Sequence, residues 1–221
     1  MQIAVIDLGV GNLTSVKQAL TAVAPDCDVV VTSDERVIDS ADRVVMPGQG
    51  AVGTWFAALH DRKLESVVRS SLANKPMLGI CIGMQALFDH CQEDGGIDGL
   101  GLFSGSVRHF SHFHSAKDSA TKKSNQERLK IPQMGWNQVV HSQDHALWHG
   151  IKDQSHFYFV HSFCANISVD ADSSMVYGEA NYGHDFIAAV GRDNVFAVQF
   201  HPEKSHDDGL KLLKNFTQWS G

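Results

Sequence analysis

The sequence is poor in proline and cysteine and has no long apolar run, and each shortage excludes a class of protein. Of 221 residues, 5 are proline and 4 are cysteine, too few for a proline-rich chain or a disulfide scaffold. No stretch approaches the roughly 20 apolar residues that a membrane helix requires. The first residues carry no basic segment and reach Asp7 at once, so we expect no signal peptide and a reduced, cytoplasmic location.

Positive charge is also scarce. The 18 Lys and Arg residues are outnumbered by 25 Asp and Glu, giving a formal net charge of −7. A nucleic-acid-binding protein needs concentrated basic residues, so we expect neither nucleic acid nor a membrane as a partner. Hydrophobic residues make up 43% of the chain, enough for a large core. Length and composition together predict a single domain over residues 1–221.

The first half of the chain alternates strand-like and helix-like patterns. Short apolar runs occur at Gln2–Ile6, Asp28–Thr32, 43–46 and 77–80. Apolar residues recur at helical spacing over 13–22 and 64–72, and a further helix is expected to begin over 82–88. Such alternation predicts right-handed βαβ units and a mostly parallel sheet.

The second half predicts additional strands. Short β-like runs, separated by polar turns, occur at 107–110, 138–140, 157–160, 175–177, 186–190 and 195–200, and one helix is expected over 209–216. We therefore expect an α/β fold whose mostly parallel central sheet is flanked by helices and extended by antiparallel strands. Residues 115–130 contain one large apolar residue, Leu129, and are predicted to form a mobile surface insertion, with a basic docking arm as the alternative.

A cysteine stands where a strand is expected to turn into a helix, in the sequence Gly79-Ile80-Cys81-Ile82-Gly83. This spacing is the thiol version of the nucleophile elbow, whose sharp turn requires small flanking residues. At a helix N-terminus, N–H groups and the dipole would favour a Cys81 thiolate, and the Ile82 N–H would point at an oxyanion. The alternative is a buried structural cysteine, which is the preferred interpretation of Cys27, Cys91 and Cys164.

A histidine followed by proline and glutamate completes a possible catalytic set. Pro202 favours extended backbone at His201, and Glu203 can fold back to one ring nitrogen while the other faces a thiol. Cys81, His201 and Glu203 would then be nucleophile, base and orienting carboxylate. Three other histidines could suggest a metal site, but no Cys or carboxylate completes their ligand set, so we expect no metal at His109, His112 and His114.

Two glycine-rich turns follow expected strands. The turn from Gly9 to Thr14 is an incomplete dinucleotide fingerprint, because Thr14 replaces the third glycine, so we expect no nucleotide there. The Pro47-Gly48-Gln49-Gly50 turn ends a strand expected to neighbour the 77–80 strand. It could supply a second oxyanion N–H from Gln49 or Gly50, and the alternative is an ordinary tight turn.

Together these segments resemble the class I (triad) glutamine amidotransferases, and within them the family of glutaminase subunits of imidazole glycerol phosphate synthase. The resemblance covers nearly the whole chain. The cysteine and histidine segments are common to the class, whereas residues 134–137, residues 158–162 and Lys204 point to this family. The chain departs from the usual family pattern, outside the triad, at Leu8, Gln49, Gln133, Ala197 and His206.

The resemblance implies a glutaminase that needs no cofactor. Cys81 would attack the side-chain amide carbon of L-glutamine, His201 would pass a proton to the leaving ammonia, and Glu203 would orient His201. Residues implied in substrate binding are Gly50, Gln85, His161, Ser162 and Phe163.

The resemblance also implies a partner. In this family ammonia passes to a cyclase subunit, in a heterodimer that makes imidazole glycerol phosphate and an aminoimidazole carboxamide ribonucleotide. Asn12, Tyr158 and Lys204 are similar to residues near that interface.

Other interpretations remain open from the sequence. The chain could serve another acceptor synthase, with the surface-sugar type harder to exclude than the anthranilate, aminodeoxychorismate or guanylate types. A binding module without activity is disfavoured because it would not need Cys81, His201 and Glu203 together. A cysteine peptidase is disfavoured because Gln85 and residues 161–163 suit a free amino acid.

Overall fold

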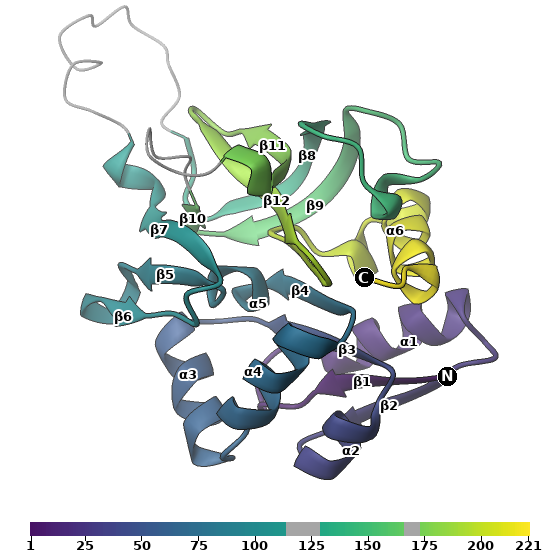
Figure 1. The fold of residues 1–221 in the computed structure, drawn as a ribbon. Coiled ribbons are helices and arrows are strands. Elements are labelled where there is room, and N and C mark those ends of the chain that lie inside the picture. Colours follow the sequence, from purple (N-terminus) through teal and green to yellow (C-terminus); the bar gives the residue numbers. More distant parts are fainter. Residues whose placement is uncertain (114–128, 166–172) are drawn as a thin grey trace, which may run out of the picture.

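Two β-sheets organise the chain (Figure 1). The computed structural model describes residues 1–113, 129–165 and 173–221. Residues 115–128 of the insertion expected at 115–130 lie outside the described residues. Within the described part, a nine-stranded sheet has the order β2-β1-β3-β4-β13-β12-β11-β8-β9, and a four-stranded sheet has the order β10-β7-β5-β6.

One half of the large sheet is parallel and largely buried. Its strands are β1 (Gln2–Ile6), β2 (Asp28–Thr32), β3 (Arg43–Gly48), β4 (Met77–Cys81) and β13 (Val195–Val198). Continuous apolar runs suit such strands because helices cover both faces of a parallel sheet. The helices are α1 (Leu13–Val23), α2 (Glu35–Ser40), α3 (Val52–Asp61), α4 (Glu65–Asn74), α5 (Ile82–Gln85) and α6 (His206–Gln218).

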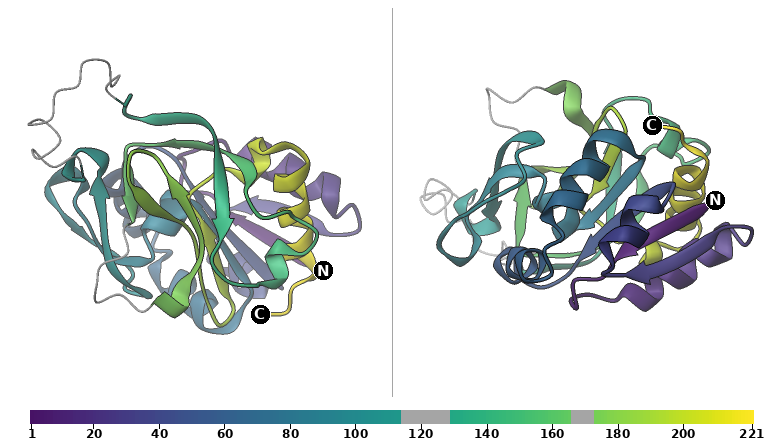
Figure 2. Two further views of the ribbon diagram at one scale, coloured as in Figure 1. Left: turned by 90° about the horizontal axis from the view of Figure 1, so that it is seen from above. Right: turned by 60° about the horizontal axis from the view of Figure 1, so that its bottom comes forward.

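The helices lie on both sides of this parallel half. α1 packs against α6, whereas α2 packs against α4, and the two groups cover opposite faces of the sheet (Figure 2). That division follows from right-handed crossovers, because β1 leads to β2 in one direction and β2 leads back to β3 in the other. No helix in the described ranges is long and apolar enough to span a membrane.

The other half of the large sheet is antiparallel, as the sequence predicts. Its strands are β12 (Asp185–Arg192), β11 (Val176–Asn181), β8 (Gln133–His141) and β9 (Ser155–His161). The α/β fold with a mostly parallel centre and added antiparallel strands is therefore confirmed. Short 3-10 helices connect the elements at η1 (Glu93–Gly95), η2 (Phe110–His112), η3 (Ala146–Trp148), η4 (Ser173–Met175) and η5 (Pro202–Lys204).

The helix expected from residue 82 ends after one turn, which corrects the sequence interpretation. The main-chain carbonyls of Ala86 and Leu87 accept hydrogen bonds from the N–H groups of Leu100 and Leu102, at 2.8 and 2.9 Å. These long-range partners replace the next helical turn. The chain instead enters a second sheet made of β5 (Phe88–Cys91), β6 (Ile97–Asp98), β7 (Phe103–His109) and β10 (Phe163–Ala165).

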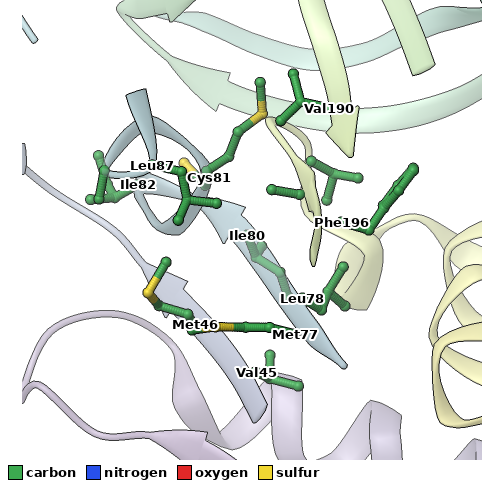
Figure 3. Packing of buried hydrophobic residues seen from close by; sticks show 14 of the residues in the cluster. Val45, Met46, Met77, Leu78, Ile80, Cys81, Ile82, Leu87, Val190 and Phe196 are labelled. Atoms are coloured by element: carbon green, nitrogen blue, oxygen red, sulfur yellow. The ribbon is translucent and has the colours of Figure 1, made fainter. Parts of the chain in front are cut away.

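The core reaches the end of β4. Met46 of β3, Leu78 and Ile80 of β4, and Phe196 of β13 are at most 1% exposed and belong to one buried hydrophobic cluster around this strand (Figure 3). Cys81 belongs to the same cluster and is 4% exposed. The cysteine therefore stands on a rigid element, which a precisely placed side chain requires.

Candidate active site

The candidate catalytic residues lie at the carboxyl ends of neighbouring parallel strands. Cys81 is the last residue of β4 and is in register with Gly48, the last residue of β3. On the other side, Ile80 is in register with Val198 of β13, and His201 follows three residues later. This edge is where open α/β sheets bind their ligands.

The backbone at Cys81 makes the sharp turn that the sequence predicts. Its φ of 56° and ψ of −108° are unusual for a residue with a side chain and cost about 1–3 kcal/mol. A Cβ on Gly83 would lie 1.8 Å from the Met46 carbonyl oxygen, and one on Gly79 would lie 2.9 Å from the Ala197 Cβ. Both flanking positions therefore have no room for a side chain.

The helix after the turn is shorter than expected. α5 has four residues, so few aligned peptide dipoles are available to stabilise a thiolate, and the expected dipole contribution is small.

His201 and Glu203 form a buried pair. His201 Nδ1 is 2.9 Å from Glu203 Oε1, and the two side chains are 2% and 1% exposed. Burial alone lowers the pKa of His201, but the negative charges of Cys81 and Glu203 and their hydrogen bonds outweigh burial and raise it to about 10. His201 Nε2 has no hydrogen-bond partner of normal geometry in the described part of the chain. This nitrogen is therefore available to interact with the Cys81 sulfur.

Three hydrogen bonds hold the His201 segment against β9. The His201 N–H donates to the Tyr158 carbonyl at 2.9 Å, and the Tyr158 N–H donates to Ser205 Oγ at 3.0 Å. The Ser205 hydroxyl then donates to the His201 carbonyl at 2.6 Å. Because Ser205 is buried, this closed set fixes the backbone that carries the imidazole.

A cavity of about 490 Å³ opens above Cys81, a size that suits a small ligand. It brings together most of the residues expected from the sequence: Gln49, Gly50, Cys81, Ile82, Gln85, Tyr158, His161, Ser162, Phe163 and Lys204. His201 and Glu203 line a separate cavity of about 10 Å³ with Asn12 and Gln49. Asn12 also caps α1, since its side chain accepts the Ser15 N–H at 3.2 Å.

Gln85 presents an unpaired oxygen at this cavity. Its Nε2 donates to the Phe163 carbonyl at 3.0 Å and to Gln199 Oε1 at 2.9 Å. Its Oε1 is buried and has no hydrogen-bond partner among the described residues. A buried acceptor without a partner is costly unless a ligand or water donates to it.

The His161 side chain is buried and hydrogen-bonded within the protein rather than open to the cavity. Burial lowers its pKa to about 4, so the ring is neutral near pH 7. Nδ1 lies 2.7 Å from the Phe163 carbonyl oxygen, and Nε2 lies 3.0 Å from Gln133 Oε1. The ring holds the turn that brings Ser162 and Phe163 to the cavity.

Two residues of the site have no role in the sequence interpretation. Glu93 lines the cavity, and its Oε2 accepts the Val52 N–H at 2.8 Å, just after the Gln49–Gly50 turn. Burial raises the pKa of Glu93. Gln199 is fully buried and donates to Cys81 Sγ. The short Gln-x-His spacing before His201 could have pointed to Gln199, whereas no local pattern marks Glu93.

The remaining histidines and cysteines singled out in the sequence form no metal-ligand group or disulfide where the structure describes them. Within the described ranges, no group of three or more His, Cys, Asp or Glu residues is placed to hold a metal ion. His109 hydrogen-bonds Ser111 at 2.7 Å, and His114 lies outside the described residues. All four cysteines are free thiols.

Comparison with known sequences gives one family. The family model described as "Glutamine amidotransferase class-I" matches residues 4–219. A protein named "Imidazole glycerol phosphate synthase subunit HisH" from Dechloromonas aromatica is 50% identical over 217 residues, which cover 98% of this chain and 96% of that protein. A "subunit HisH 1" of the same synthase from Pseudomonas aeruginosa is 47% identical over 220 residues, covering 99% and 97%.

Comparison with solved structures gives the same fold. A crystal structure described as a glutamine amidotransferase aligns with a TM-score of 0.66 at 17% identity, covering 97% of this chain and 98% of that one. The glutaminase domain of Trypanosoma brucei CTPS, solved with bound acivicin, aligns with a TM-score of 0.58 at 14% identity, covering 100% and 95%. With a family model matched over almost its whole length, the chain belongs to the class I glutamine amidotransferase family.

Proposed function

We propose that this chain is the glutaminase subunit of imidazole glycerol phosphate synthase and releases ammonia from glutamine at Cys81. The observation that carries the proposal is the 47–50% identity, over nearly the full length of both chains, to subunits of that name. The buried set of Cys81, His201 and Glu203 beside a cavity supports the chemistry. A cytoplasmic location and a heterodimer with a cyclase subunit are parts of the same proposal.

In the first half of the reaction, the Cys81 thiolate attacks the side-chain amide carbon of glutamine. The carbonyl π electrons move to oxygen, giving a tetrahedral oxyanion. His201, protonated near neutral pH because its pKa is about 10, gives its Nε2 proton to the amide nitrogen. The carbon–nitrogen bond breaks, ammonia leaves, and a glutamyl thioester remains on Cys81.

In the second half, water hydrolyses the thioester. Neutral His201 now takes a proton from water through Nε2, and the oxygen attacks the thioester carbon. The carbon–sulfur bond breaks, which releases glutamate and restores the thiolate beside the imidazolium. Glu203 accepts the Nδ1–H throughout, which holds the ring and stabilises its charged form.

Binding of the amino-acid end of glutamine is assigned to polar groups of the large cavity. The unpaired Gln85 Oε1 and the Glu93 carboxylate suit the α-ammonium group, since both accept hydrogen bonds. The backbone of Ser162 and Phe163 and the turn at Gly50 line the same space and are proposed to hold the α-carboxylate side. The side chain of His161 supports this wall from behind.

The oxyanion is assigned to backbone N–H groups at Ile82 and at the Gln49–Gly50 turn. Ile82 directly follows the nucleophile, as in other nucleophile elbows. Gly50 has a φ of +95° and lies on the loop that follows β3, whose last residue, Gly48, is in register with Cys81. Two donors at this point would stabilise the charge that develops only in the transition state.

The cyclase is proposed to cover the mouth of the cavity. Lys204 Nζ lies 5.9 Å from the centre of the Tyr158 ring, and both residues line the cavity. On the neighbouring strand β8, Met134 is 65% exposed and Trp136 is 45% exposed. Large apolar side chains in the open beside an active site favour a protein partner there.

Glutamate release from glutamine tests the proposal. We expect a low rate for the purified chain alone, and a large rise when the cyclase subunit and its ribonucleotide ligand are added together. Alkylation of Cys81 by acivicin, without any rise on adding the cyclase, would retain a glutaminase but assign it to another acceptor synthase. The absence of both alkylation and glutamate release would refute the proposal.

Replacing the nucleophile separates ammonia production from its use. Cys81→Ala should abolish glutamine-dependent turnover by the complex, because no thioester can form. Turnover with added ammonium salt should persist, since that reaction belongs to the cyclase. Loss of both activities in a complex that still assembles would contradict the division of labour between the subunits.

A further inference from the structure

Gln199 is a fully buried glutamine beside the nucleophile, and the mechanism above does not use it. It lies directly after β13, and its Nε2 donates to Cys81 Sγ at 3.6 Å. Its Oε1 accepts a hydrogen bond from Gln85 Nε2 at 2.9 Å. One side-chain amide therefore connects the nucleophile to the residue proposed to bind the α-ammonium group of glutamine.

A backbone carbonyl determines the orientation of both amides. The Phe163 carbonyl oxygen can only accept, so the end of Gln85 that faces it at 3.0 Å is the NH₂ group. The same NH₂ group contacts Gln199, which must therefore present its oxygen to Gln85. The remaining NH₂ group of Gln199 then faces Cys81, because turning either amide would place two donors or two acceptors together.

The surroundings of Gln199 hold this arrangement in place. Its N–H donates to the Ala188 carbonyl at 2.9 Å, so the backbone is tied to β12. His201 lies two residues further along, and one short segment thus supplies two groups beside the Cys81 sulfur. A buried donor aimed at sulfur favours the thiolate over the thiol.

We propose that Gln199 is a positioning residue, whose amide holds the Cys81 thiolate and couples it to glutamine bound at Gln85. This inference rests on the proposed glutaminase function. A substrate ammonium group that donates to Gln85 Oε1 polarises that amide and strengthens its donation to Gln199. The side-chain NH₂ group of Gln199 then becomes a stronger donor to sulfur. In such chains each hydrogen bond is strengthened by about 10–30%. Substrate binding and nucleophile activation are thereby linked through two amides.

Several titratable groups share the environment of the Cys81 sulfur and therefore also influence how its alkylation depends on pH. His201 lies just before η5 and Glu203 lies within it, and the buried, neutral His161 ends β9. Across the cavity stand Glu93, Tyr158 and Lys204. Each of these groups is unchanged in a variant at Gln199, so a change in thiolate formation in that variant reports the amide itself.

The test compares Gln199→Met with Gln133→Met in the full chain. Both glutamines are buried, but Gln133 hydrogen-bonds His161 and not Cys81. The rate of Cys81 alkylation by iodoacetamide is followed against pH by peptide mass spectrometry. In Gln199→Met, the midpoint should move to higher pH, because the thiolate loses its amide donor, and alkylation below the midpoint should be slower. In Gln133→Met the midpoint should stay unchanged.

A second variant isolates the donor. Gln199→Glu keeps an acceptor for Gln85 but loses the NH₂ group, so it should shift the alkylation midpoint in the same direction. In the complex with the cyclase, both Gln199 variants should lose about tenfold or more in kcat, with the KM for glutamine changed less than about threefold. A residue that only supports packing would lower the unfolding temperature without moving the midpoint.

The outcomes separate this inference from the proposed function. An unchanged alkylation midpoint and unchanged kcat in folded Gln199 variants would overturn the positioning role. An equal midpoint shift in Gln133→Met would also overturn it, because the effect would then be general. Wild-type chain that neither reacts with acivicin nor releases glutamate would instead refute the glutaminase itself, whatever the behaviour of Gln199.

Discussion

Replacing Glu203 with glutamine tests the charge of the His201–Glu203 pair while keeping its shape. The carboxylate oxygen 2.9 Å from His201 Nδ1 would become an amide oxygen, which still accepts the Nδ1–H and preserves the tautomer. The negative charge that helps to raise the pKa of His201 to about 10 would be gone. The pKa of His201 should fall, and the imidazolium that donates a proton to the leaving ammonia should be less stable.

The size of the effect follows from that single bond. A hydrogen bond to a charged partner contributes about 1.5–3 kcal/mol. Both side chains of the pair are at most 2% exposed, so solvent screening is small. At about 1.4 kcal/mol for each factor of ten, kcat should fall roughly 10- to 150-fold. The free energy of unfolding should fall as well, because an amide NH₂ would replace Glu203 Oε2, which has no hydrogen-bond partner among the described residues.

The assay is glutamate release by the complex, with acivicin alkylation of Cys81 as a check that the elbow is intact. Cys81 in Glu203→Gln should still be alkylated, since its turn depends on Gly79 and Gly83. Glu65→Gln is the matched control, because Glu65 pairs with Arg69 on an exposed helix surface and should leave turnover unchanged. Unchanged kcat in Glu203→Gln would remove this carboxylate from the mechanism.

Two further predictions concern stability. Gly83→Ala should lower the free energy of unfolding by about 1–3 kcal/mol or more, because the new Cβ meets the Met46 carbonyl oxygen. The same variant should slow Cys81 alkylation. An unchanged thermal midpoint would contradict the close contact. Burial lowers the pKa of His145 to about 4, so its contribution to stability is present above pH 6.5 and is lost as pH falls towards 4. His145→Asn, which can still accept the Leu147 N–H, should show a smaller loss of urea stability between pH 7 and 5 than the wild type, and equal losses would argue against this residue.

The parallel half of the fold could be predicted from sequence because its signals are local. The runs at Gln2–Ile6 and Asp28–Thr32 are bounded by polar turns, and the structure has strands with these bounds. The small second sheet could not be predicted in the same way. Its strand β6 has two residues, and β5 forms where long-range hydrogen bonds to residues 100–103 replace a helix. α3 begins without a side-chain cap, so its start carries no sequence signal either.

The residues of the candidate site also differ in whether local sequence or long-range contacts place them. Cys81, His201 and Glu203 could be proposed from short motifs. The strained turn at Cys81 and the proline after His201 each give a sequence pattern that is contained within five residues. Gln199 and Glu93 act across the fold instead: Gln199 bonds a residue 118 positions away, and Glu93 bonds one 41 positions away. Contacts at that separation depend on strand order, which the hydrophobic pattern alone does not specify.

Both halves of the large sheet are needed to assemble the site. The parallel half supplies Cys81 at the end of β4, but the backbone that carries His201 is held by Tyr158 of the antiparallel strand β9. The Phe163 carbonyl, at the start of β10, orients Gln85 and through it Gln199. A chain with only the parallel strands formed would therefore have a nucleophile without an oriented base or substrate contact. Because Tyr158 also lines the cavity mouth proposed for the cyclase, a partner that moves β9 would act directly on the position of the His201 imidazole.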